Sequence, residues 1–103
     1  MQTNFKVDIT NNPEFDHFIF HGNIDIHAAI YFQALPDNVA KAKVRMDFSR
    51  VGRINSMGIA LLLRCCKKIR DEKKAEIILT GANTMHTMLF KTTGVFLLAA
   101  VES

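Results

Sequence analysis

Apolar residues recur along this chain with two different periods, and segments of the two kinds alternate. Residues 5–9 and 44–48 alternate apolar with polar side chains, which is the pattern of a half-buried strand. From about Ser56 to Lys73, apolar residues instead recur at helical spacing and make one stripe, with charged residues opposite. Strands that alternate with helices predict an α/β fold in which the helices pack on a mixed sheet.

Turn and capping residues divide the chain into these segments. The predicted strands are residues 5–9, 15–20, 44–48 and 77–79, and the predicted helices are residues 25–35, 56–73 and 85–92. Asp25 is expected to cap the first helix, and Gly94 to end the last one in a left-handed conformation. The continuous apolar run at 77–79 is typical of a strand that is covered on both faces. The type of the apolar segment 95–101 stays open. A mixed sheet of four to five strands follows.

Length and composition restrict the class of protein. A chain of 103 residues, 49% hydrophobic and 22% charged, predicts a single globular domain over residues 1–103. It has no apolar run of the ~20 residues that span a bilayer, and Met1 to Thr10 lack the pattern of a secretory signal. The two cysteines are neighbours and predict no disulfide framework. We therefore expect a cytoplasmic protein without direct membrane insertion.

The charge is unevenly distributed. The formal net charge is +3, and eleven of the thirteen Lys and Arg residues lie between Lys41 and Lys74. Only Asp47, Asp71 and Glu72 oppose them there. This run is either a solvated surface or a docking face for an acidic partner, and the sequence leaves both open. Nucleic-acid binding is less favoured, because little aromatic surface accompanies the charges.

No pattern of catalytic or cofactor-binding residues is found. His17 and His21 would lie roughly 13 Å apart on a strand, too far to share one metal ion, and His27 and His86 are expected in surface or helix-end roles. Cys66 is expected to be buried, and Cys65 to be more exposed but not activated. A catalytic pair of carboxylates is not expected, because Asp8, Asp25 and Asp47 lie on separate elements. We expect no enzyme, no cofactor and no metal site.

The most informative stretch runs from Asp47 to Leu62. A strand ends, a short loop is expected after it, and a small polar pair, Asn55-Ser56, opens the long helix. Asn55 or Ser56 can serve as the N-cap of that helix, because each side chain can accept a hydrogen bond from a free helical N–H.

This stretch resembles the STAS family, which includes bacterial anti-sigma factor antagonists. Asp47-Phe48-Ser49, Val51 and Ser56-x-Gly58 match its pattern of a strand, a short connection and an apolar helix. The likeness extends in order to residues 22–25, 77–81 and 88–95, and so covers nearly the whole chain. Asn55 departs from the pattern, since the family usually has Asp before the serine.

The resemblance implies a switch by phosphorylation. In antagonists of this type, the serine at the position of Ser56 is phosphorylated by a serine kinase that is also the anti-sigma factor, and a serine phosphatase reverses the reaction. The dephosphorylated form binds its target. Around Ser56 the implied partner-binding residues are Asp25, Arg50, Arg53, Asn55, Met57 and Gly58. A helix N-terminus suits a phosphate, and Arg50 and Arg53 are candidates to assist it.

Other interpretations remain. Ser56 can be only an N-cap, and some STAS proteins are subunits of membrane transport or lipid-trafficking complexes that are not phosphorylated. The regulated output, a sigma factor or another process such as biofilm production, is not decided by the sequence. A monomer is favoured.

Overall fold

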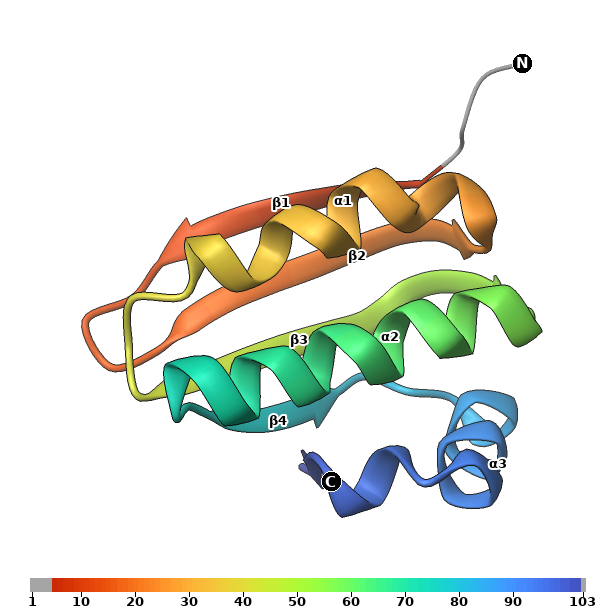
Figure 1. The fold of residues 1–103 in the computed structure, drawn as a ribbon. Coiled ribbons are helices and arrows are strands. Elements are labelled where there is room, and N and C mark those ends of the chain that lie inside the picture. The colour runs from red at the N-terminus through yellow and green to blue at the C-terminus, as the bar shows by residue number, and fades with distance from the viewer. Residues whose placement is uncertain (1–4, 103) are drawn as a thin grey trace.

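Strands and helices alternate along residues 5–102, the part of the chain that this computed structural model describes (Figure 1). Residues 1–4 and 103, the ends of the predicted 1–103 domain, lie outside the described residues. Residues 1–4 are also the start of the segment Met1 to Thr10, which lacks the pattern of a secretory signal. The strands are β1 (Lys6–Asn11), β2 (Asp16–Ile24), β3 (Lys43–Ile54), β4 (Glu76–Thr80) and β5 (Ala100–Val101). The helices are α1 (Ala29–Ala34), α2 (Ser56–Lys68) and α3 (Thr84–Thr93). The 3₁₀ turns η1 (Ile26–Ala28), η2 (Leu35–Asn38) and η4 (Val95–Leu97) and the π-helical turn η3 (Ile69–Lys73) extend or connect them.

The sheet is mixed, as predicted. Its strand order is β1-β2-β3-β4-β5, with β1 antiparallel to β2 and every other pair parallel. A helix connects each parallel pair, so α1, α2 and α3 all begin at the edge where the parallel strands end. The fold class predicted from periodicity is therefore confirmed.

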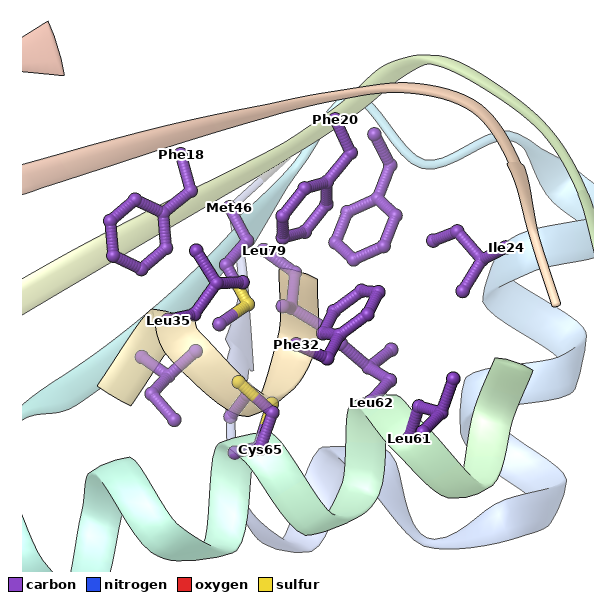
Figure 2. Close-up of a cluster of buried hydrophobic side chains, with 14 of the residues drawn as sticks. Phe18, Phe20, Ile24, Phe32, Leu35, Met46, Leu61, Leu62, Cys65 and Leu79 are labelled. Atoms are coloured by element: carbon purple, nitrogen blue, oxygen red, sulfur yellow. The ribbon is translucent and has the colours of Figure 1, made fainter. Parts of the chain in front are cut away.

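The core lies between the helices and one face of the sheet. Figure 2 shows side chains of β2 and β3, such as Phe20 and Met46, directed toward Phe32 of α1 and Leu62 of α2. Phe48 links this cluster to α3, because its ring lies 5.3 Å from that of Phe20 and 5.2 Å from that of Phe90. Side chains on the opposite face, such as Ile78, are only half-buried. The expectation that residues 77–79 are covered on both faces is wrong for this reason.

Strand β3 is much longer than the predicted strand 44–48. Two bulges interrupt its alternation of buried and exposed residues, so the pattern does not reveal its second half. Its buried side chains are Val44, Met46 and Phe48, and the next one, Val51, comes after two exposed residues instead of one. Register shifts against β2 occur on either side of Arg50–Val51. Each bulge inserts one extra residue and re-aims the side chains that follow. The short loop predicted before Asn55-Ser56 is therefore wrong, since the strand continues to Ile54.

Asp47 supports the first bulge. Its Oδ1 accepts a hydrogen bond from the backbone N–H of Ser49 at 2.8 Å. Burial alone would raise the pKa of the Asp47 carboxyl, but the hydrogen bonds from Ser49 and the charges of His17 and Arg50 hold that pKa below its ordinary value. The Asp-Phe-Ser sequence thus has a local structural role where β3 changes direction.

Candidate functional site

Ser56 is the first residue of α2, at the edge of the sheet where β3 ends. Asn55 is the N-cap, with an extended backbone (φ −90°, ψ −177°), and its Oδ1 accepts a hydrogen bond from the N–H of Gly58 at 2.8 Å. Of the two predicted capping residues, the structure therefore selects Asn55. Ser56 is exposed, and its hydroxyl takes no part in the cap.

The ends of β2 and β3 are bonded together beneath Ser56. The N–H of Asn55 donates to the carbonyl of Ile24 at 3.2 Å, and the N–H of Arg53 donates to Oδ1 of Asn23 at 2.9 Å. Gly58 lies so close to this junction that an added Cβ would be 2.0 Å from the Ile24 carbonyl oxygen. Only a residue without a side chain fits there, which gives the glycine of the Ser-x-Gly pattern a physical reason.

Most of the predicted site residues are brought together by this junction. Asp25 follows Ile24 and so borders the first turn of α2, and it caps η1 as predicted, with its Oδ1 accepting from the N–H of His27 at 2.9 Å. Met57 is 49% exposed beside Ser56, and Arg53 is exposed on the other side of Asn55. Gly58 is buried, so it acts on this surface only through the backbone.

Arg50 is the exception. It lies within β3 opposite His21, six residues before Ser56, which is at most about 20 Å along the strand. It therefore belongs to the body of the strand, before the junction at which β2 and β3 end, and not to the expected loop.

Next to Asn55 lies a groove that the sequence analysis missed. It has a volume of about 570 Å³ and runs between the end of β3 and α3, with Ile54, Met85 and Leu89 among its lining residues. His86 supports it: its Nε2 is 2.7 Å from the carbonyl oxygen of Gly52, and its Nδ1 is 3.3 Å from the N–H of Asn83. An Nδ1 that accepts from the amide leaves the proton on Nε2, which then donates to Gly52.

His86 had been assigned only a surface or helix-end role. The helix end is confirmed, because Asn83 is the N-cap of α3 and forms a reciprocal capping box with His86. Its burial, with 3% of the residue exposed, was not foreseen. The Asn83-x-x-His86 spacing was the available signal, with His in the place that Glu or Gln usually takes.

The two cysteines carry no reactive thiol. Both are buried, which corrects the expectation that Cys65 is more exposed: it lies beside Phe32 of α1, under the α1–α2 contact. Burial raises the pKa of the Cys65 thiol to about 12 and that of Cys66 well above its ordinary value. A thiol is a nucleophile only as the thiolate, so both side chains serve packing.

Within residues 5–102, no group of three or more His, Cys, Asp or Glu side chains is placed to hold a metal ion. In the same residues, no helix has the length and apolar character needed to cross a membrane.

Comparison with known proteins identifies the fold. The sequence profile of the STAS domain family matches residues 6–102. An anti-sigma-factor antagonist (STAS) domain protein from Planctomyces limnophilus has a similar structure, with a TM-score of 0.76 at 19% identity over 94% of this chain and 88% of that one. Among proteins with curated descriptions, none matches this sequence.

Two more solved structures have a similar fold. The Bacillus cell fate determinant SpoIIAA in its phosphorylated form has a TM-score of 0.67 at 17% identity, over 96% of this chain and 91% of that one. A sulfate transporter family protein from Wolinella succinogenes has a TM-score of 0.70 at 13% identity, over 79% of this chain and 67% of that one. At these identities the likeness is one of fold.

Proposed function

This chain belongs to the STAS domain family, and from that premise we propose that it is a non-catalytic regulatory protein whose binding to a protein partner is switched by phosphorylation of Ser56. It acts in the cytoplasm as an antagonist of an anti-sigma factor or of an equivalent partner. Similarity to a solved anti-sigma-factor antagonist domain and to SpoIIAA in its phosphorylated form supports this proposal.

The observation that carries the proposal is the exposure of Ser56 at the start of α2. Because Asn55 provides the cap, the hydroxyl of Ser56 is free to react without loss of the bond that begins the helix. A helix of 13 residues presents unpaired N–H groups and a partial positive charge at this end, which stabilise a phosphate. Arg53, three residues before Ser56 in the chain, is exposed and contributes a further positive charge.

Phosphorylation would release the partner by electrostatics alone. A phosphoserine adds about −1.5 to −2 charges, which must lose water when the surface around it docks. Asp25 and Met57, which flank Ser56, belong to that surface. A loss of ~3 kcal/mol in binding free energy weakens the complex more than a hundredfold, so no conformational change of the domain is needed.

The proposed partners are a serine kinase, which is also the target that the unphosphorylated form binds, and a serine phosphatase. Asn55 replaces the usual acidic residue beside the phosphorylated serine. Since Asn caps a helix about as well as Asp, the substitution keeps the structure and removes one negative charge from the surface that the kinase recognises.

The test is phosphorylation by the cognate kinase with ATP, followed by mass spectrometry. We expect one added phosphate, lost in Ser56→Ala and retained in Ser49→Ala, a matched control because Ser49 is also an exposed serine. We also expect the unphosphorylated protein to bind the kinase more than a hundredfold more tightly than the phosphorylated one. Phosphate that persists in Ser56→Ala, or equal affinities of the two forms, would contradict the proposal.

A second candidate is a STAS subunit of a membrane transport or lipid-trafficking complex, favoured by the likeness to the sulfate transporter family protein. It predicts stable co-purification with a membrane transporter or its ATPase, unchanged by Ser56→Asp. The switch predicts that Ser56→Asp weakens partner binding.

A further inference from the structure

The groove beside Asn55 has the edge of a strand as one wall. β3 pairs with β4 only over Lys43–Asp47, so its later residues have no strand partner on that side within residues 5–102. Gly81 passes close to Ser49, and after it α3 takes the place of β4. The groove is therefore open between the free edge of β3 and the side of α3.

Hydrogen bonds identify which backbone groups face the groove. The N–H groups of Arg53 and Asn55 both point to β2, where they donate to Asn23 and Ile24. Successive residues of a strand point their backbone groups to opposite edges. The N–H and C=O of Ile54 therefore face the groove, as does the carbonyl of Gly52, which receives the bond from His86.

The opposite wall is apolar and open. Met85, which lines the groove, is 76% exposed. A hollow continues from Met85 past Met88 and Leu89 to Thr92. Methionine adapts its shape to different apolar partners, so this wall suits side chains of an inserted segment.

The charge of the surroundings is positive. Residues 51–55 and 83–89, which supply the walls, contain no Asp or Glu, and Asp47 lies earlier on β3, beside Gly81. Arg53 lines the groove, and Lys91 lies on the same helix as Met88. A partner segment with carboxylates is complementary to this field.

We propose that this groove binds an extended segment of the regulatory partner, which adds as a short strand to the free edge of β3. Its apolar residues face Met85 and Leu89, and its acidic residues alternate with them and lie toward Arg53. A segment of about four residues spans ~13 Å as a strand. Main-chain bonds to Ile54 supply affinity, and the alternating side chains supply specificity. This inference rests on the proposed function only for the identity of the partner.

A concave wall with unpaired strand groups favours a peptide over a lipid surface. A bilayer would leave the N–H and C=O of Ile54 without partners in an apolar environment, which is costly. A peptide backbone satisfies both groups.

The test uses unphosphorylated protein and three synthetic peptides. The first alternates Leu with Glu, the second alternates Leu with Lys, and the third is the first with N-methylated amides on the edge that would face β3. We expect the Glu peptide to bind and to shift the amide resonances of Ile54, Asn55 and the first turns of α3. The Lys peptide and the N-methylated peptide should bind at least tenfold more weakly.

Two pairs of variants test the contributions of Arg53 and Met85 to peptide binding separately. Arg53→Glu should weaken binding of the Glu peptide about three- to tenfold. Arg64→Glu, the same change at an exposed residue of α2 that lies beside α1 and does not line the groove, should not. Met85→Gln should weaken it severalfold, with Ile30→Gln as the control, because Ile30 is 74% exposed on α1, away from the groove.

Equal binding of the parent and N-methylated peptides, equal binding of the Glu and Lys peptides, or resonance shifts confined to α1 and α2 would overturn the inference. So would binding to vesicles of anionic phospholipid with no binding of the Glu peptide. No kinase takes part, so failure here leaves phosphorylation of Ser56 untouched, and failure of that phosphorylation leaves the groove untouched.

Discussion

Gly58→Ala tests whether the close contact between α2 and β2 is what positions Ser56. An alanine Cβ at this position would lie 2.0 Å from the carbonyl oxygen of Ile24 and 2.6 Å from its carbonyl carbon. Both are backbone atoms, so neither can rotate away. Ordinary contact begins at 3.4 Å, and the first turn of α2 must therefore move by about 1.4 Å.

Three terms set the magnitude. Such a movement breaks the bond from the N–H of Asn55 to Ile24, which is worth about 0.5–1.5 kcal/mol. Forcing a methyl group into a packed site costs about 1–3 kcal/mol. Replacing Gly by Ala within a helix returns about 1 kcal/mol. The free energy of unfolding should therefore fall by about 2 kcal/mol, which lowers the Tm of a domain of this size by roughly 8–16 °C.

Urea denaturation followed by circular dichroism measures this change. Ala60→Gly is the matched control, because Ala60 is exposed in the same helix and reports the helix propensity alone, about 1 kcal/mol. A Gly58→Ala protein as stable as the wild type, or more stable, would refute the contact as the reason for this glycine. We also expect Gly58→Ala to bind the partner more weakly, since Ser56 moves with the first turn of α2.

Other predictions concern caps, a buried histidine and the thiols. Asn55→Ala should lose about 1 kcal/mol of stability in urea denaturation, whereas Asn55→Asp should keep it; equal losses would contradict the cap. His86→Leu leaves the carbonyl of Gly52 without its donor and should cost about 1–3 kcal/mol; an unchanged urea midpoint would show that this bond contributes nothing. A thiol-specific reagent at pH 8 should label Cys65 and Cys66 only in denaturant, and rapid native labelling would contradict their burial.

The raised thiol pKa values also predict a pH dependence. Above the ordinary thiol pKa of 9.0, the unfolded chain loses protons that the folded chain retains, since burial raises the pKa of Cys65 to about 12. Stability should therefore fall as the pH rises from 9 toward 12. The double variant Cys65→Ala, Cys66→Ala should show a weaker fall over this range, and an identical profile would contradict the assignment.

Local patterns predicted the elements that depend on neighbours in the chain. The stripe along α2, a cap at Asn55 or Ser56 and the left-handed Gly94 (φ 88°) all follow from residues within one or two turns of each other. The alternation at 44–48 likewise predicted the first half of β3. Each of these features depends on interactions between residues that are close in the sequence.

The second half of β3 could not be read in this way. Two bulges change the spacing of inward-facing residues from two to three, first between Phe48 and Val51 and then between Val51 and the half-buried Ile54. The strand thereby loses the periodicity by which strands are recognised. The free edge that these residues present exists because β4 ends at Thr80 and α3 follows, a distant event in the chain. For the same reason His86 appeared isolated, although its partner Gly52 lies 34 residues away.

The sequence by itself determined the alternating α/β order, the capped start of the long helix and the serine at that position, because hydrophobic period and capping are local properties. Tertiary structure alone decided that Cys65 is covered by α1, that Gly58 must approach Ile24, and that Asn55 stands at the end of a groove. These depend on how the ends of β2, β3 and α3 meet in space, and no spacing along the chain specifies that meeting.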